Sequence, residues 1–335
     1  MKGRDKMTIK IAIVNSSSFG KYFPSHMDRL KKLGEVDRFE FSKDIRGKEL
    51  AEKLMGYSII IASVTAQYDR EFFEKKDKTL LIARHGIGYN NIDIGAATEK
   101  GTFVTIVDAI VEREAVAENA IALLTSVIRQ VGLAWRKVRE GKWEERAKLI
   151  GYEIKGKTVG IIGFGNIGSR VGEILKYGFN TKLIAYDPYL SSEEIIKRGA
   201  EPVSLEELLK NSDIISLNAF VDENSYHILS DKEFSLMKKG VFIVNTARGE
   251  LIDEKSLIKA LDEGIVAGLG IDVVEGEPID QHHPLLAYKN VIITPHISAY
   301  TYECLSGMGD KVVSDVEKVV KGENPDNVVN KELLK

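Results

Sequence analysis

A glycine-rich turn is the part of this sequence whose residue types and spacing most clearly predict chemistry. The apolar run Thr158–Ile162 leads into the sequence GFGNIG, and a helical pattern follows. Gly163 permits a tight turn from strand to helix, Gly165 lets a pyrophosphate approach the backbone, and Gly168 lets the helix pack closely on the strand. Together these residues predict a site for the phosphates of a dinucleotide, at the positive end of the helix dipole.

A second apolar run ends on Asp187, roughly 20 residues after the glycine turn. A carboxylate at that position can accept both ribose hydroxyls of an adenosine, whereas it would repel a 2′-phosphate, so NAD is favoured over NADP. A glycine pattern by itself can also be a simple turn, but here a strand, a helix and a terminal acid accompany it. The predicted cofactor-binding residues in this stretch are Gly163, Gly165, Asn166, Ile167, Gly168 and Asp187.

Three further polar residues each follow a predicted strand in the second half of the chain. Arg248 follows Val241–Asn245, Glu277 lies a few residues after the run that ends at Asp272, and His296 comes shortly after Val291–Thr294. Open α/β sheets bind ligands at the carboxyl ends of their strands, so we expect these three side chains to meet on one rim beside the nicotinamide. Taken singly, the arginine could cap a turn, the glutamate could belong to a surface loop, and the histidine could be a satisfied residue at a strand end.

The elements that must position these residues alternate between strand and helix. From residue 8 to residue 106 the apolar and amphipathic segments alternate, which predicts a parallel sheet covered on both faces. The turn after its first strand, from Asn15 to Gly20, lacks the glycine pattern, so this domain is not expected to hold the dinucleotide. We therefore predict an α/β protein with two doubly wound parallel-sheet domains, a flavodoxin-like substrate domain and a Rossmann NAD-binding domain, with the cleft between them.

The predicted domains are residues 1–107 together with 300–335, and residues 108–299. A final helix at residues 302–320 is long enough to return to the first domain, which makes that domain discontinuous. The stretch from residue 114 to 139 is predicted as one long helix with apolar residues on more than one face. Such a helix is buried either within its own chain or between subunits, and we favour a homodimer formed through the NAD-binding domains.

Composition excludes several classes of protein. The 335 residues are 44% hydrophobic and 29% charged with a net charge of -3, which is typical of a globular protein and gives no reason to expect nucleic acid or membrane partners. Cys304 is the single cysteine, so the chain has neither an intramolecular disulfide nor a thiolate metal site, and no metal is predicted. The first residues lack the apolar segment of a signal peptide, and we expect a cytoplasmic protein.

Several motifs together resemble the D-isomer-specific 2-hydroxyacid dehydrogenase family. They are GFGNIG, VNTARGELIDE, GLGIDVVEGEP and NVIITPHISA, with RHGIGYNNID at residues 84–93, VAEN at 116–119 and HHPLL at 282–286. The resemblance covers residues 80–300 and implies an NAD-dependent enzyme that interconverts a small 2-oxo acid and its D-2-hydroxy acid. It is similar to the phosphoglycerate, glyoxylate and hydroxypyruvate reductases, without a C-terminal regulatory domain.

The resemblance also implies roles for individual residues. Arg248 would bind the substrate carboxylate and polarise its carbonyl, His296 would be the acid-base residue, and Glu277 would be its hydrogen-bonded partner. Asp272 would receive the nicotinamide carboxamide. The remaining implied contacts are the Thr246 and Ala247 backbone along the nicotinamide ring, with Arg248 and His296 beside it, and the Ile87 and Gly88 N–H groups on the substrate carboxylate.

The sequence departs from the family pattern in places. Asn218, Ala219 and Phe220 stand where the family often has histidine or cysteine followed two residues later by proline, so this cofactor-flanking loop differs. Glu277 argues against formate as substrate, and Ala62 replaces an arginine that phosphoglycerate-type members commonly carry. Two other functions stay open: an NAD(H)-sensing scaffold similar to the family's corepressors, and a dehydrogenase of an inorganic acid such as phosphite.

Overall fold

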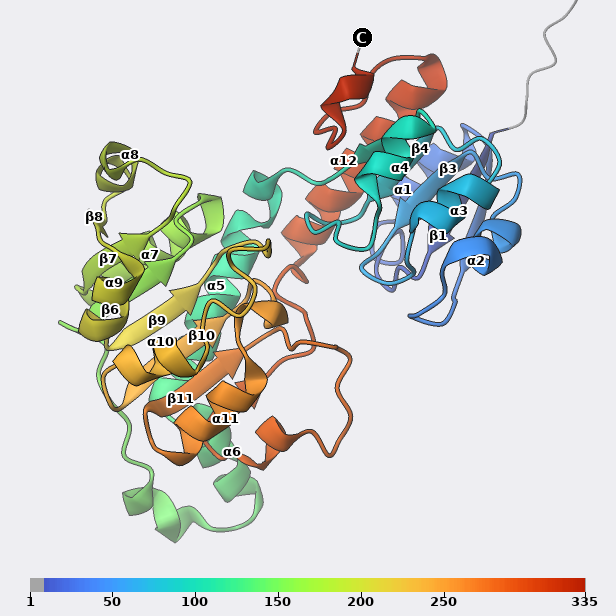
Figure 1. Ribbon diagram of the computed structural model, residues 1–335. Helices are drawn as coiled ribbons and strands as arrows, with labels where there is room; N and C mark the ends of the chain where they lie inside the picture. Colours follow the sequence, from blue (N-terminus) through green and yellow to red (C-terminus); the bar gives the residue numbers. More distant parts are fainter. Residues whose placement is uncertain (1–8, 335) are drawn as a thin grey trace, which may run out of the picture. The chain divides into compact units, whose positions relative to one another are not determined.

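The computed structural model describes residues 9–334, which form two compact units (Figure 1). Among the described residues, the first unit comprises residues 9–111 and 301–334, and the second comprises Glu112–Tyr300. The strand that the sequence predicts from residue 8 is described from residue 9 onward, and its first residue lies outside the described part.

The first unit contains a parallel sheet of five strands in the order β2-β1-β3-β4-β5. This is the flavodoxin-like order of a doubly wound sheet. Every residue of β3 and β4 is buried, as expected for central strands covered on both faces. The strands are β1 (Lys10–Val14), β2 (Glu35–Phe39), β3 (Ile59–Ala62), β4 (Leu81–Arg84) and β5 (Phe103–Thr105).

Of the helices within residues 9–334, five belong to the first unit, four of them between its strands and the fifth from the other end of the chain. They are α1 (Pro24–Lys31), α2 (Gly47–Lys53), α3 (Arg70–Lys75), α4 (Ile94–Glu99) and α12 (Tyr302–Lys321). Helix α12 places Val312, Val313 and Val316 in one core with Ile11 and Ile13 of β1. The burial of this apolar stripe fixes the C-terminal helix on the first sheet.

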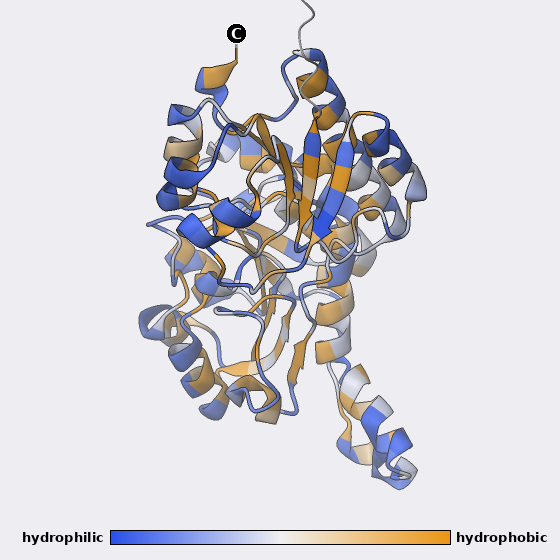
Figure 2. Cartoon of the chain, turned by 90° about the vertical axis from the view of Figure 1, so that its right-hand side faces the viewer, coloured by the Kyte–Doolittle hydropathy of each residue, from blue (hydrophilic) through white to orange (hydrophobic). Residues whose placement is uncertain are grey.

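The second unit contains a parallel sheet of seven strands in the order β12-β11-β10-β9-β6-β7-β8. From β8 to β11 this is the Rossmann arrangement, in which the strand order reverses next to β6. Apolar cores lie against the sheet, and Figure 2 shows most of the strands coloured as hydrophobic. The strands are β6 (Thr158–Ile162), β7 (Lys182–Tyr186), β8 (Glu201–Pro202), β9 (Ile214–Leu217), β10 (Val241–Asn245), β11 (Val266–Ile271) and β12 (Val291–Ile293).

Two short elements of the second unit were not predicted from the sequence, and one predicted long helix is divided. Short elements occur where none was assigned, at α8 (Ser192–Lys197) and at β8. The remaining helices are α7 (Asn166–Phe179), α9 (Leu205–Asn211), α10 (Asp231–Leu236) and α11 (Glu254–Asp262), with 3₁₀ turns at Trp143–Lys148, Gly249–Leu251, Pro284–Ala287 and, in the first unit, Lys331–Leu333.

The long helix predicted at residues 114–139 is wrong as a single element. It is divided into α5 (Ala109–Ile128) and α6 (Val131–Arg139). The division occurs because Gln130 has a φ of 53°, in the left-handed region, which ends one helix and redirects the chain before the next. Helix α6 contains no buried residue, and its Trp135 is 58% exposed.

No helix within residues 9–334 combines the length and the apolar character that crossing a bilayer requires.

Candidate functional site

The glycine turn has the geometry that a dinucleotide requires. Strand β6 ends at Ile162, Gly163 takes a φ of 84°, and helix α7 begins at Asn166 with Gly165 as its N-cap. A Cβ added at Gly168 would lie 2.0 Å from the carbonyl oxygen of Gly163, so only glycine allows this close packing of helix on turn. A Cβ at Gly165 would meet nothing within 4 Å, which leaves the space beside its backbone open for a ligand.

Asp187 lies at the end of the neighbouring strand and is tied to the same turn. Its Oδ2 accepts a hydrogen bond from the backbone N–H of Phe164 at 2.8 Å, and its Oδ1 accepts one from Tyr189 at 2.9 Å. A carboxylate has about four acceptor positions, so both oxygens can still accept ribose hydroxyls. The positive end of α7, the open glycine and this acid fit the phosphates and the adenosine ribose of a dinucleotide.

The strand pairing explains how the other predicted residues come to one edge of the sheet. Asn245 of β10 is paired with Ile271 of β11, and Ile271 is paired with Ile293 of β12. The three parallel strands therefore end in one row, and the segments that carry Arg248, Asp272 and His296 leave the sheet side by side. The adjacent β9 is paired so that Leu217 continues this row.

Asn245 shapes the turn that carries Arg248. This asparagine is 1% exposed. Its Nδ2 donates to the carbonyl oxygen of Arg248 at 2.8 Å, and its Oδ1 accepts from the Ala247 N–H at 2.9 Å. Thr246 is buried in this turn, and the Arg248 guanidinium, through Nη1, donates to the Ala247 carbonyl at 2.6 Å. Asn245 is not among the residues predicted from the sequence, although an amide side chain at a strand end shortly before an arginine is a signal for such a turn.

His296 and Glu277 are hydrogen-bonded to each other. Nδ1 of the imidazole meets Oε1 of the carboxylate, while Oε2 accepts the backbone N–H of Val274 at 3.3 Å. Each of the two side chains is 35% exposed, so the pair is accessible from solvent. The backbone of His296 has a φ of 54°, which is rare for a residue with a side chain and shows that surrounding contacts hold it.

Asp272 supplies those contacts. Its carboxylate is 1% exposed and accepts four hydrogen bonds, from Thr294 Oγ1 (2.5 Å), Ile297 N (2.9 Å), Ser298 N (2.7 Å) and Ser298 Oγ (2.5 Å). Its backbone carbonyl also accepts the His296 N–H at 2.9 Å. Asp272 thus builds the loop in which the histidine is held. The proposed contact of Asp272 with the nicotinamide carboxamide stays a prediction.

Ile87 and Gly88 lie in the first unit, in the loop after β4. This loop is anchored by Arg84, which is 3% exposed and donates through Nη1 to the carbonyl oxygens of Ala62 (3.2 Å) and His85 (3.0 Å). Burial, together with the nearby Arg84 charge, lowers the pKa of the neighbouring His85 to about 3. The neutral His85 ring packs edge-on against Phe19 at 5.2 Å between centroids.

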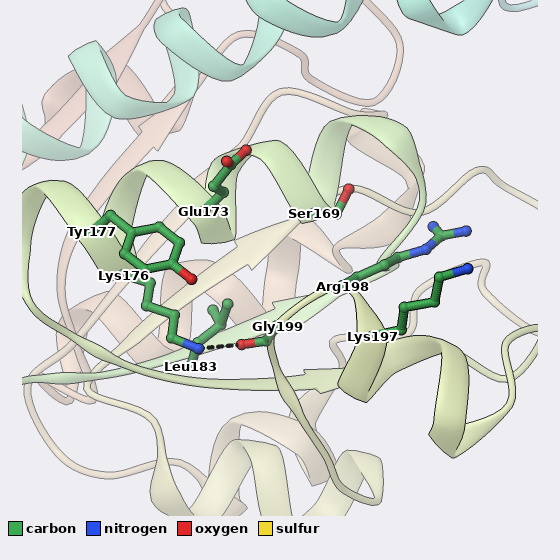
Figure 3. Close-up of a pocket in the computed structure, with 8 residues that line it drawn as sticks. All are labelled: Ser169, Glu173, Lys176, Tyr177, Leu183, Lys197, Arg198 and Gly199. Atoms are coloured by element: carbon green, nitrogen blue, oxygen red, sulfur yellow. Dashed lines mark hydrogen bonds between the residues drawn. The ribbon is translucent and has the colours of Figure 1, made fainter.

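A cavity of about 350 Å³ lies elsewhere in the second unit, beside α7 (Figure 3). Its lining residues are Ser169, Glu173, Lys176, Tyr177, Leu183, Lys197, Arg198 and Gly199. In Figure 3 the Lys176 ammonium donates to the Gly199 carbonyl, at 2.7 Å, across one side of the cavity. None of the predicted cofactor residues lines it, so it is not the dinucleotide site. Among residues 9–334, no group of three or more His, Cys, Asp or Glu side chains could hold a metal ion.

The sequence matches a known family of proteins over the part of the chain that forms this site. Residues 121–298 match the family model described as D-isomer specific 2-hydroxyacid dehydrogenase, NAD binding domain. That range contains the glycine turn, Arg248, Glu277 and His296.

The chain belongs to the D-isomer specific 2-hydroxyacid dehydrogenase family.

Individual relatives agree with this assignment along nearly the whole chain. The dehydrogenase is 38% identical over 311 residues to a glyoxylate reductase of Thermococcus litoralis, covering 91% of this chain and 93% of the relative. The crystal structure of a glyoxylate reductase from Paecilomyes thermophila is 31% identical with a TM-score of 0.83, covering 97% of this chain and 99% of that one. That of D-lactate dehydrogenase from Aquifex aeolicus, complexed with NAD and lactic acid, is 29% identical with a TM-score of 0.83, covering 96% and 99%.

These comparisons confirm the predicted fold class, the family and the cofactor. The dehydrogenase is an NAD-dependent oxidoreductase with two parallel-sheet α/β domains.

Proposed function

We propose that this dehydrogenase interconverts a small 2-oxo acid and its D-2-hydroxy acid, with Arg248 as the carboxylate-binding residue and His296 with Glu277 as the acid-base pair. The observation that carries the proposal is the hydrogen bond from the imidazole to the Glu277 carboxylate, made beside the strand end that leads to Arg248. A histidine oriented by a carboxylate on one ring nitrogen can exchange a proton through the other.

The cofactor would be held by the glycine turn, the start of α7 and Asp187. Bound NADH supplies the hydride in the reduction and NAD accepts it in the oxidation. The residues proposed to line it are Gly163, Gly165, Asn166, Ile167, Gly168 and Asp187, and near the nicotinamide Thr246, Ala247, Arg248, Asp272 and His296.

The chain's own residues would then act on the substrate. The planar guanidinium of Arg248 can form a bidentate pair with a carboxylate, which fixes the 2-oxo group next to it and stabilises negative charge on the oxygen. With Nδ1 bonded to Glu277, His296 would donate the proton from Nε2 to that oxygen. The Glu277 carboxylate stabilises the imidazolium form that donates. Ile87 and Gly88, in the loop anchored by Arg84, are proposed to bind the substrate carboxylate through their N–H groups.

A substrate panel tests the proposal. NADH and NADPH are each mixed with glyoxylate, hydroxypyruvate, pyruvate, a bulkier 2-oxo acid and 3-phosphohydroxypyruvate, and absorbance at 340 nm is followed. We expect NADH oxidation with at least one unphosphorylated acid and weak or no oxidation of NADPH, because Asp187 would repel the 2′-phosphate. The His296→Ala variant should lose on the order of a thousandfold in kcat.

The same assay separates the alternatives. Turnover of no 2-oxo acid, with NADH still bound, would contradict the proposal and favour an NAD(H)-sensing scaffold. Reduction of NAD by phosphite would instead indicate an inorganic acid as substrate. A control variant, Glu201→Gln at the opposite edge of the same sheet, should keep wild-type rates, since its carboxylate is exposed and remote from the strand ends.

We further propose a cytoplasmic homodimer formed through the NAD-binding units. Val131, Trp135 and Val138 of α6 are each more than half exposed, and a second copy would cover this apolar surface. Replacing Trp135 and Val138 with glutamate should convert a dimer into a monomer in light scattering after size-exclusion chromatography. A wild-type monomer would contradict the dimer. The single, buried cysteine Cys304 is consistent with a reducing compartment.

A further inference from the structure

A cluster of polar side chains surrounds Glu275, in the loop that carries Glu277. Glu275 accepts a hydrogen bond from the Tyr226 hydroxyl at 2.9 Å on Oε1. Its Oε2 meets Nε2 of His227 at 2.8 Å. The Tyr226 and His227 rings stack on each other, with 3.9 Å between their centroids and 19° between their planes. We call Tyr226, His227 and Glu275 the clamp.

The clamp is itself anchored to the segment that follows Arg248. The backbone N–H of His227 donates to the Glu250 carbonyl at 2.8 Å, and Leu229 forms a parallel bridge with Ile252. Nδ1 of His227 lies 3.5 Å from Oδ2 of Asp253, which also caps α11 by accepting the Ser256 N–H at 2.8 Å. Residues 227–229 are therefore tied to the segment that leads into α11.

A direct backbone contact joins the Arg248 turn to the Glu277 turn. A Cβ added at Gly249 would lie 2.1 Å from the Glu275 nitrogen and 2.2 Å from the Val274 carbonyl carbon. Only a glycine lets the two turns touch in this way. Gly249, which follows Arg248, thus packs on Glu275, which lies two positions before Glu277.

The turn between Val274 and Glu277 carries both Glu275 and Glu277. Two hydrogen bonds close it. The Glu277 N–H donates to the Val274 carbonyl at 3.2 Å, and the Glu277 side chain accepts from the Val274 N–H. Gly276, with a φ of 76°, separates Glu275 from Glu277, and the two carboxylates point to different partners on either side of it. Holding Glu275 therefore fixes the backbone from which Glu277 reaches His296.

We propose that Tyr226, His227 and Glu275 form a positioning clamp that sets Glu277 against His296 and keeps that pair in register with Arg248. The inference rests on the proposed function, because it concerns the same acid-base pair. The charged and titratable groups around the clamp are Glu250 and Asp253. The bond to Glu275 raises the pKa of Tyr226, so the tyrosine keeps its proton and donates throughout the neutral range.

Substitutions at Glu275 test the clamp. In Glu275→Ala, both bonds are lost and we expect kcat for the 2-oxo acid to fall roughly 10- to 100-fold, the usual effect of removing a residue that orients a ligand-contacting group. The KM for NADH should stay within about twofold, because the clamp lies outside the glycine turn. Glu275→Gln offers an acceptor and a donor of the same shape and should recover most of kcat.

Two further variants separate positioning from general stability. Gly249→Ala displaces the Glu275 backbone without touching the clamp side chains, and we expect it to lower kcat in the same direction. Tyr288→Phe removes a tyrosine–carboxylate bond of similar kind, to Asp262 at 2.7 Å, away from the clamp, and should leave kcat unchanged. Wild-type kcat in Glu275→Ala, or a loss of kcat there matched by an equal rise in the KM for NADH, would overturn the proposal.

A spectroscopic readout without substrate keeps this test separate from the proposed function. The Nδ1 proton between His296 and Glu277 should give a low-field proton NMR resonance, assigned by its absence in Glu277→Leu. Glu275→Ala should broaden or remove that resonance, while Tyr288→Phe should keep it. An unchanged resonance in Glu275→Ala would overturn the clamp, whether or not the dehydrogenase reduces any of the panel acids.

Discussion

Replacing the Glu277 carboxylate with an amide of the same shape tests the proposed acid-base pair with a minimal change of structure. In Glu277→Gln the side chain keeps its shape and an acceptor oxygen for Nδ1 of His296, but it loses the negative charge that stabilises the imidazolium. Hydrogen bonds to charged groups contribute about 1.5–3 kcal/mol and neutral ones about 0.5–1.5 kcal/mol. Both side chains are 35% exposed, so water screens the pair and the lower part of that range applies.

The charge is therefore worth about 1 kcal/mol, which predicts a roughly fivefold loss of kcat/KM in Glu277→Gln. Glu277→Leu removes the whole bond, about 2 kcal/mol, and predicts a roughly 30-fold loss. The assay is NADH oxidation at 340 nm with the best acid of the panel, under saturating NADH. Values of kcat/KM within twofold of wild type for both variants would refute the assigned role of Glu277. A wild-type value in Glu277→Gln beside a loss in Glu277→Leu would show that the charge is not what matters.

Three other predictions concern separate parts of the chain. Arg248→Lys should raise the KM for the 2-oxo acid and lower kcat/KM by at least about a hundredfold, as a lysine cannot form the bidentate pair; steady-state kinetics checks this. Gly165→Val should abolish NADH binding in a fluorescence titration with a nearly unchanged Tm, because its Cβ enters open space, whereas Gly168→Ala should lower the Tm. Because the folded pKa of His85 is about 3, below the unfolded value near 6.5, the unfolded chain takes up a proton first as pH falls through that window. Stability should thus fall by about 2 kcal/mol between pH 6.5 and 5, and urea unfolding of His85→Leu should show this loss removed.

The glycine turn illustrates what could be predicted from the sequence. Its neighbours along the chain supply the strand, the helix and the terminal acid, so Gly163, Gly165 and Asp187 could be placed by local spacing. The alternation of strands and helices likewise predicted two parallel sheets, because each element buries its apolar residues with its own period. The expectation for His296 and Glu277 followed from a general rule about strand ends, and the register of β10, β11 and β12 provides its basis.

The errors and omissions have a common cause. The break between α5 and α6 depends on the left-handed backbone conformation of Gln130, which the pattern of apolar and polar residues does not predict. The loop that holds His296 depends on hydrogen bonds from the Asp272 carboxylate to residues more than 20 positions later, which the sequence analysis did not predict. The bond from Tyr226 to Glu275 joins residues 49 apart. Hydrogen bonds between residues so far apart cannot be predicted from the sequence of a single helix or strand.

The sequence by itself determined the kind of fold, the nucleotide turn and the side chains available for proton transfer and anion binding, because these depend on residue type and short spacing. Tertiary structure decided how those side chains are held: which nitrogen of His296 meets a carboxylate, how Asp272 builds the loop around it, and how Gly249 brings two turns into contact. Each of these depends on the register of parallel strands and on backbone packing between distant segments, and both are set only when the sheet of the second unit is assembled.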